Sequence, residues 1–202
     1  MVKGGYSQIL EGLARGLDIR KGCPVAEIRH GGDGVTVVTA GGEEVAGDAV
    51  LVTAPLGVLK AGSIAFSPPL PDWKTDAVGR LGFGDLNKVI LEFDEAFWNP
   101  ELDFFGAAVG GCTPGEDPSA VRGRCFMFWN LHRFSGAPVV GTLLSGASAR
   151  AAEGESDAAL QAAAMALLER IHPDADVPKP RACHVSRWGS EPFTRGSYSF
   201  VA

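Results

Sequence analysis

The sequence predicts an α+β protein, and three observations support this class. Three runs rich in β-branched residues follow one another closely near the start of the chain, at 24–30, 34–40 and 48–53. Glycine-rich turns separate them, which is typical of antiparallel strands in a meander. Further along, residues 156–171 are rich in alanine and carry apolar side chains at helical spacing. Strands and a separate helix of this kind indicate an α+β fold.

The first part of the chain is expected to contain one helix, a meander and a buried strand. Residues 6–15 carry apolar side chains at a helical period, with Ser7 suited to cap the helix and Gly16 to end it. The run 48–53 is apolar through its centre, which predicts a strand buried on both faces. Pro55 ends this strand, because proline has no amide hydrogen to donate to a ladder.

The rest of the chain is expected to form further strands and two further helices. The glycine- and proline-rich stretch 110–119 is expected to be a loop. The helix predicted at 156–171 is capped by Ser156 or Asp157, and its apolar stripe runs from Leu160 to Ile171. The predicted strands are 87–93, 124–130, 139–145 and 182–188, and the predicted helices are 72–81 and 156–171.

Composition argues against several classes of protein. The 202 residues carry a net charge of −6, with acidic and basic residues mixed along the chain, which argues against a broad basic surface for nucleic acid. The N-terminus has no apolar signal region, and no run approaches the ~18 apolar residues of a membrane span. The cysteines are scattered without metal-ligand spacing, so reduced thiols are expected and a zinc site is not. They are Cys23, Cys112, Cys125 and Cys183.

Lys88 is a conspicuous polar residue. It follows Gly82 and Gly84 and enters an apolar strand, where an unpaired ammonium is costly to bury. One interpretation is a lysine that extends from the strand end into solvent. The other is a lysine that faces a functional cavity. The residue pattern alone leaves both interpretations open.

Aromatic side chains gather in two segments. In the strand predicted at 124–130, alternation places Phe126 and Phe128 on one face and Met127 and Trp129 on the other. Most such residues belong to a core, but several that converge on one cavity make a cage suited to an amine or a flat cofactor ring. The second group, near the end of the chain, is Trp188, Phe193, Tyr198 and Phe200.

Several segments together resemble the flavin-dependent amine oxidase family, most closely its lysine-specific histone demethylase branch. They occur in the family's order and span almost the entire chain, so the set is specific although each string alone is weak. The segments are Gly5–Ser7, Gly16–Ile19 with Val25, Thr53–Lys60, Phe66–Lys74, Leu81–Lys88, Phe97–Pro100, Phe128–Leu131, Ser186–Trp188 and Arg195–Phe200.

The resemblance implies a catalytic role for Lys88, at the position where the family has the lysine that holds a water against the flavin N5. It implies FAD as the cofactor and no metal. Phe193 stands where the demethylases commonly have tryptophan, and Phe200 where tyrosine is common. The implied cofactor-binding residues are Val25, Thr53, Ala54, Pro55, Trp188 and Phe193, and the implied substrate-binding residues are Trp129 and Tyr198.

The implied reaction removes a hydride from the carbon next to an amine nitrogen and passes it to FAD. Water hydrolyses the resulting imine, and dioxygen reoxidises the flavin and yields peroxide. The resemblance places residues 1–84 in the middle portion of an FAD-binding domain, as an antiparallel meander plus a buried strand. It places residues 85–202 in an incomplete substrate domain, a mixed sheet backed by helices. A glycine-rich phosphate loop is absent from the sequence, so this chain alone is expected neither to hold FAD tightly nor to turn over.

The resemblance also implies partners and a compartment. The substrate is expected to be a methylated lysine of a histone peptide or another amine, with dioxygen as the second substrate. A polyamine oxidase is the alternative within this class, and a non-catalytic binding or scaffold module is the alternative from another class. The demethylase branch implies a nuclear protein with a chromatin corepressor as candidate partner; a cytoplasmic location is expected otherwise. Neither a membrane nor a direct nucleic-acid site is expected.

Overall fold

The computed structural model of this chain describes residues 5–107 and 122–201. The chain forms two compact units. One comprises Gln8–Gly84 and Glu191–Ala202, and we call it the meander unit. The other comprises Met1–Ser7 and Asp85–Ser190, and we call it the sheet–helix unit. In the described part of the chain, no helix is both long and apolar enough to cross a membrane.

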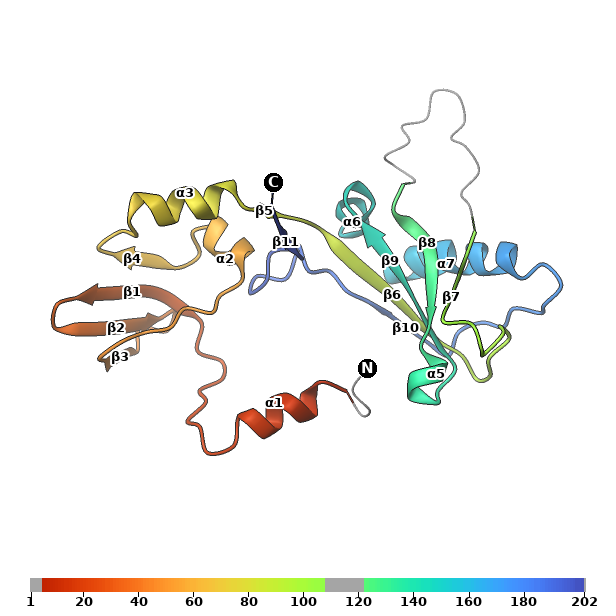
Figure 1. Cartoon of the computed structure of the whole chain (residues 1–202), viewed down its shortest axis with the longest axis horizontal. Coiled ribbons are helices and arrows are strands. Elements are labelled where there is room, and N and C mark those ends of the chain that lie inside the picture. The colour runs from red at the N-terminus through yellow and green to blue at the C-terminus, as the bar shows by residue number, and fades with distance from the viewer. Residues whose placement is uncertain (1–4, 108–121, 202) are drawn as a thin grey trace, which may run out of the picture. The chain divides into compact units, whose positions relative to one another are not determined.

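The meander unit contains a four-stranded sheet in the order β3-β2-β1-β4 (Figure 1). Strands β1 and β2 pair antiparallel, which confirms the first two strands of the predicted meander. The third strand, β3, also pairs antiparallel but lies before the predicted run 48–53, and β1 and β4 pair parallel. The elements of this unit are α1 (Ser7–Leu13), β1 (Val25–Gly31), β2 (Gly34–Thr39), β3 (Glu44–Gly47), α2 (Leu56–Lys60), β4 (Ala65–Ser67), α3 (Asp72–Arg80), β5 (Gly82–Phe83) and β11 (Ser199–Phe200).

The end of the chain belongs to the meander unit. Strand β11 pairs antiparallel with β5, with Ser199 opposite Phe83 and Phe200 opposite Gly82. The expected second domain, 85–202, therefore differs from the compact unit, which ends at Ser190. The sequence pattern did not indicate this return, because a two-stranded pairing between distant segments has no local signature.

The predicted buried strand at 48–53 is wrong. These residues form no strand, and Leu51 is 86% exposed. A strand buried on both faces needs neighbours that accept and donate its backbone hydrogen bonds. Within residues 5–107 and 122–201 no strand pairs with this run. The apolar composition is therefore not sufficient to make it a strand.

The sheet–helix unit is built on a five-stranded sheet in the order β10-β6-β9-β8-β7. Every described pair is antiparallel, so the mixed sheet expected here is instead antiparallel, and the parallel pair lies in the meander unit. The loop predicted at 110–119 lies outside the described residues. The elements are β6 (Leu86–Glu92), β7 (Phe104–Gly106), β8 (Arg124–Asn130), α5 (His132–Ser135), β9 (Val139–Ser145), α6 (Ala147–Ala152), α7 (Asp157–Ile171) and β10 (Ala182–Val185).

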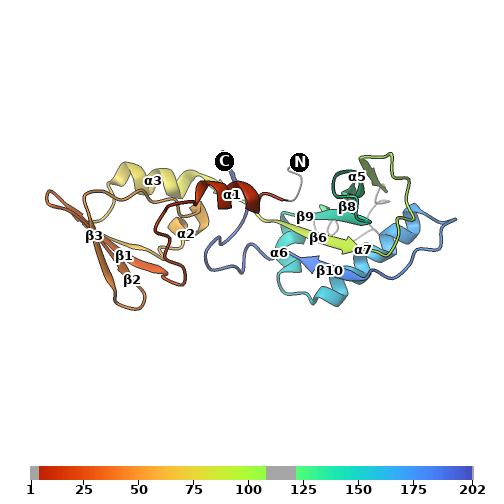
Figure 2. The ribbon, with the colours of Figure 1, turned by 90° about the horizontal axis from the view of Figure 1, so that it is seen from below.

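Helix α7 covers one face of this sheet (Figure 2). The predicted apolar stripe is confirmed, because the helix buries the stripe residues from Leu160 to Leu168, and only Ile171 at its end is half-buried. Full burial of one leucine side chain contributes about 1.5–3 kcal/mol relative to leaving it exposed. The helix residues are Leu160, Ala164, Leu167 and Leu168, and the sheet residues in the same core include Val89, Leu91, Phe128, Val140 and Leu144.

Ser156 caps α7, as predicted. Its Oγ accepts a hydrogen bond from the backbone N–H of Ala159 at 3.2 Å. Replacing Ser156 by alanine is expected to destabilise the protein by about 1 kcal/mol, because it leaves that N–H without its acceptor. Urea unfolding measures this loss, and Ser156→Asp is the control that should retain the cap. Equal stability of the alanine and wild-type proteins would contradict the capping role.

Candidate functional site

Strand register places Lys88 on the face of the five-stranded sheet that α7 does not cover. Its neighbours Asn87 and Val89 are buried, whereas Lys88 and Ile90 alternate with them on the other face and are half-buried. Leu143 of β9 lies directly opposite Lys88. The strand therefore directs the lysine side chain away from the hydrophobic core.

Trp129 lies on the same face as Lys88. Gly141 of β9 is opposite both Ile90 of β6 and Trp129 of β8, and residues directly opposite in antiparallel strands share a face. A Cβ at Gly141 would lie 2.7 Å from Ile90 Cδ1, so glycine leaves the room in which the Ile90 side chain packs. The register thus brings together two of the predicted site residues, the lysine and the tryptophan.

The expected alternation of aromatic residues in β8 is only partly correct. Phe128 is buried and Trp129 half-buried, in keeping with opposite faces, but Phe126 is 40% exposed and does not share the face of Phe128. The register between β8 and β9 shifts between Arg124 and Phe128, and Cys125 has a positive φ of 49°. A bulge of this kind moves the residues before it to the opposite face.

The backbone of Lys88 is fixed by Ser186. The N–H of Lys88 donates to Ser186 Oγ at 2.8 Å, and the N–H of Ser186 donates to the Lys88 carbonyl at 3.0 Å. Among the described residues, no carboxylate lies within ion-pair distance of the Lys88 ammonium. An ammonium of this kind can donate to water or to a ligand.

Trp188 follows β10 and belongs to the same unit. Its backbone N–H donates to Asn87 Oδ1 at 3.0 Å, and Asn87 directly precedes Lys88 in β6. The indole is partly exposed. Lys88, Trp129 and Trp188 are therefore the predicted site residues that the sheet–helix unit holds.

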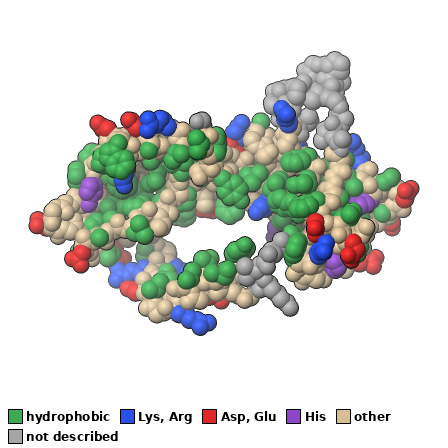
Figure 3. All heavy atoms as spheres, in the orientation of Figure 1, with side chains coloured by type: hydrophobic (Ala, Val, Ile, Leu, Met, Phe, Trp, Pro, Cys, Tyr) green, Lys and Arg blue, Asp and Glu red, His purple; other side chains and the backbone are tan. Residues whose placement is uncertain are grey.

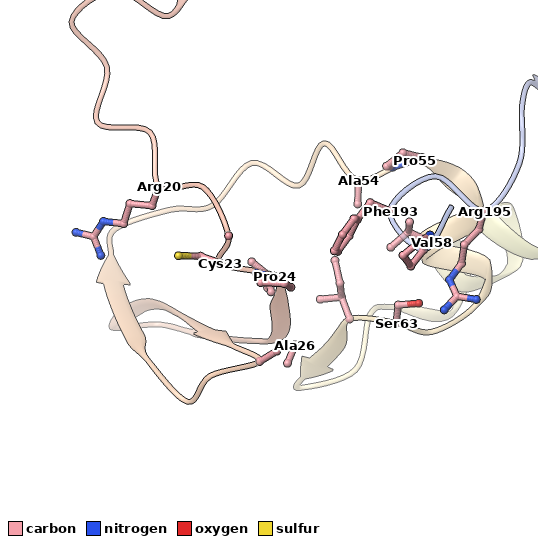
Figure 4. Close-up of a pocket in the computed structure, with 15 residues that line it drawn as sticks. Arg20, Cys23, Pro24, Ala26, Ala54, Pro55, Val58, Ser63, Phe193 and Arg195 are labelled. Atoms are coloured by element: carbon pink, nitrogen blue, oxygen red, sulfur yellow. The ribbon is translucent and has the colours of Figure 1, made fainter. Parts of the chain in front are cut away.

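The meander unit contains a cavity of about 600 Å³ that brings four of the predicted cofactor-binding residues together. Val25 lies at the start of β1, Ala54 and Pro55 precede α2, and Phe193 comes from the C-terminal segment. Figure 4 shows the Phe193 ring pointing into the space between these segments. Thr53 is adjacent in the chain but does not line the cavity.

The chemistry of this cavity fits part of a dinucleotide cofactor. Its volume lies within the usual range for small-molecule sites. Its walls are mostly apolar, and two arginines, Arg20 and Arg195, line it as well. Arginine is suited to phosphate groups. Arg20 also pairs with Glu43 at 2.9 Å, which fixes one of its nitrogens on the protein.

Tyr198 is held by its backbone and leaves its ring exposed. The Tyr198 carbonyl accepts a hydrogen bond from Gly84 N at 2.7 Å, and Ser197 N donates to the Gly84 carbonyl at 2.9 Å. The side chain is 64% exposed. The predicted site residues thus fall into two groups, one in each unit, with Tyr198 and Phe193 on the same C-terminal segment.

Sequence reasoning missed several residues that the structure places at these positions. Arg20 and Arg195 line the cavity, and Asn87 links Lys88 to Trp188. The available signal for Asn87 is its position, since a polar amide on the core face of an apolar strand needs a hydrogen-bonding partner. The arginines carry no comparable signal, because the cavity is assembled from segments far apart in the sequence.

Two of the cysteines, Cys125 and Cys183, lie away from the predicted site residues and have perturbed thiols. Burial raises the pKa of the Cys125 thiol and also that of Cys183, so both are poor nucleophiles at neutral pH. Both are free thiols in the structure. Cys23 is an exposed free thiol at the cavity, and Cys112 lies outside the described residues. In the described ranges, no three His, Cys, Asp or Glu side chains are grouped to hold a metal ion.

The fold and these residues define a class of flavin enzymes. The family described as "Flavin containing amine oxidoreductase" matches residues 1–202, and this chain belongs to that family. The match confirms the predicted family, and with it a flavin as the family's cofactor and amine oxidation as its chemistry.

Curated relatives include both branches considered above. "Lysine-specific histone demethylase 1 homolog 3" of Arabidopsis thaliana is 44% identical over 211 residues, which cover 100% of this chain and 12% of the relative. "Histone demethylase-like protein A" of Aspergillus fumigatus is 43% identical and covers 100% of this chain and 20% of the relative. "Polyamine oxidase 2" of Arabidopsis thaliana is 41% identical, over 97% of this chain and 37% of the relative. The chain therefore spans well under half of each of these relatives.

Solved structures support the same fold. A putrescine oxidase bound to putrescine matches with a TM-score of 0.74 and 24% sequence identity, over 98% of this chain and 41% of that chain. At this identity the likeness bears on the fold alone. It confirms the predicted α+β class.

Proposed function

We propose that this chain is the cofactor- and substrate-binding portion of an FAD-dependent amine oxidase that demethylates methylated lysine in histones. The observation that carries the proposal is the placement of Lys88 and Trp129 on one face of the five-stranded sheet, the face opposite to α7. The ammonium has no carboxylate partner among the described residues, so it is available to water or to a ligand. Relatives named as histone demethylases support the choice of substrate.

Each residue group has its own task in this proposal. FAD, when bound, supplies the acceptor for the hydride that leaves the carbon next to the amine nitrogen. Lys88 Nζ donates a hydrogen bond to a water and orients it. Trp129 and Tyr198 present apolar aromatic surfaces to the methylated amine, and such surroundings favour its neutral form because they disfavour charge.

The meander unit supplies the cofactor contacts in this proposal. Val25, Ala54, Pro55 and Phe193 line the cavity, and we assign them to FAD together with Thr53 and Trp188. The meander residues up to Gly84 then belong to an FAD-binding domain and the five-stranded sheet to a substrate domain. In the longer protein we expect nuclear location and a chromatin corepressor as partner, in keeping with the demethylase names of the relatives.

A polyamine oxidase is the second candidate function. A relative named polyamine oxidase is 41% identical over nearly the whole chain, which is close to the identity with the demethylases. Both candidates use the same cofactor and the same removal of hydride next to an amine. They differ in the substrate. Because this chain spans only a small part of such proteins, we expect residues outside it to contribute to the choice of substrate.

Peroxide release from the full-length, FAD-loaded protein tests the proposal. We expect turnover of a dimethyl-lysine histone peptide and little or no turnover of spermine. Turnover of spermine alone would replace the proposed substrate by a polyamine. Absence of flavin absorbance in the full-length protein would contradict the proposed enzymatic function and would favour a binding or scaffold module.

A further inference from the structure

Glu153, at the end of α6, holds the segment that follows β10. Its Oε1 accepts hydrogen bonds from Asn87 Nδ2 at 2.7 Å and from the Gly189 N–H at 3.0 Å. Its Oε2 accepts from the Ser190 N–H at 3.0 Å and from the Ser190 hydroxyl. Every one of these donors is neutral. The carboxylate therefore acts as an acceptor for a particular backbone conformation.

Asn87 extends this arrangement to the strand that carries Lys88. Its side chain is buried, at 1% exposure, and its Nδ2 donates to Glu153. Its Oδ1 accepts from the Trp188 N–H at 3.0 Å and from Ser186 Oγ at 3.3 Å. Ser186 in turn exchanges two hydrogen bonds with the Lys88 backbone. A continuous set of hydrogen bonds thus joins Glu153 to the backbones of Lys88 and Trp188.

Gly189 provides an independent, steric observation. A Cβ at this position would lie 3.1 Å from Glu153 Oε1 and 3.2 Å from its carboxyl carbon. A side chain there would make the carboxylate give way by a few tenths of an ångström, so glycine eases the close approach. The segment after Trp188 is therefore shaped to receive Glu153.

We propose that Glu153 is a positioning residue that, through Asn87, fixes the segment Ser186–Ser190 against the start of β6 and so sets the positions of Lys88 and Trp188 for amine oxidation. This inference rests on the proposed function, because it assigns Lys88 and Trp188 to the reaction. Burial acts to raise the pKa of the Glu153 carboxyl, but hydrogen bonds from Ser190, Asn87 and Gly189 outweigh burial and lower it. The group is therefore ionised at neutral pH and accepts from all its donors at once.

The test compares Glu153→Gln with Glu169→Gln in the full-length protein. A glutamine at 153 must turn its amide nitrogen toward N–H donors, so part of the set is lost. Glu169 is exposed on α7 in the same unit, and Glu169→Gln removes the same charge without touching the segment. Retention of wild-type circular dichroism identifies variants that fold.

Hydrogen exchange of a peptide covering residues 186–190 gives a measurement that does not depend on the flavin. We expect exchange about tenfold faster in Glu153→Gln and unchanged in Glu169→Gln. Stopped-flow reduction of the bound flavin by the amine is the second measurement. We expect a limiting rate about ten- to a hundredfold lower in Glu153→Gln, with FAD content retained and the apparent substrate Kd little changed.

Unchanged exchange in Glu153→Gln would overturn the proposal, as would faster exchange with a wild-type rate of flavin reduction. If Glu153→Gln does not fold, Ser190→Ala removes one donor and should show the same two effects at smaller size; wild-type behaviour of that variant would also overturn the proposal. A wild-type protein that never reduces its flavin would instead contradict the proposed function, and the exchange comparison would still decide whether Glu153 fixes the segment.

Discussion

Replacing Lys88 by methionine in the full-length, FAD-loaded protein is expected to lower the rate of flavin reduction by an amine about 100-fold or more. Methionine keeps the length and apolar stem of lysine, and Lys88 lies on the face of β6 that α7 does not cover, outside the hydrophobic core. We therefore expect thermal stability and FAD content close to wild type. The loss would come from the missing N–H donor rather than from altered packing.

Stopped-flow spectroscopy of the flavin measures this rate directly. Lys179→Met is the matched control, because Lys179 is exposed in the same unit and has no ion pair in the described part of the chain. It should reduce its flavin at the wild-type rate. A Lys88→Met protein that does the same would show that Lys88 is only a strand-end lysine, the first of the two interpretations that the sequence leaves open.

Replacing Gly57 by alanine is expected to destabilise the protein by about 3 kcal/mol, the upper end of the usual range for overpacking. A Cβ at Gly57 would lie 2.5 Å from the Arg195 carbonyl oxygen, 2.6 Å from that of Thr194 and 2.7 Å from Phe83 Cε1. Two of these three atoms are backbone, so they cannot move aside by a change of rotamer. The C-terminal segment has to shift away from α2.

This shift should also weaken FAD binding, because Phe193 and Arg195 of the same segment line the cavity with Val58 of α2. Urea unfolding and FAD titration of the full-length protein measure the two effects. Gly79→Ala is the control, since Gly79 is helical and a Cβ there would meet nothing within 4 Å. That change is expected to stabilise the protein by up to about 1 kcal/mol. Equal stability of the two variants would contradict the close approach at Gly57.

The sequence predicts local structure well where the residues that start, stop and bury an element all lie within that element or next to it. Helix α7 has a cap, an apolar stripe and a proline after its end, and its buried residues are those expected. The meander has glycine-rich turns that fix its pairing. The run around Leu51 is apolar enough for a buried strand, but composition does not say whether a neighbouring strand accepts its hydrogen bonds.

The candidate site is less accessible to local reasoning. Val25 and Phe193 meet in one cavity although most of the chain lies between them, and no spacing rule joins such residues. The family resemblance supplied both. The link between Asn87 and Glu153 is equally non-local, at 66 residues apart, and the resemblance did not indicate it. The bulge near Cys125 also depends on pairing with β9, so alternation alone placed Phe126 on the wrong face.

The return of the C-terminal segment to the meander unit has a consequence for synthesis on the ribosome. Strand β5 leaves the ribosome before any residue of the five-stranded sheet, whereas its partner β11 emerges only after that whole sheet. At a translation rate of about 5–20 residues per second, β5 remains unpaired for at least several seconds. The nascent meander unit therefore remains incomplete until the whole inserted unit has been translated, and chaperones have that interval in which to bind its apolar surfaces. Figure 3 also shows hydrophobic side chains in a row along α1, where Leu10 and Leu13 are exposed in the complete unit as well.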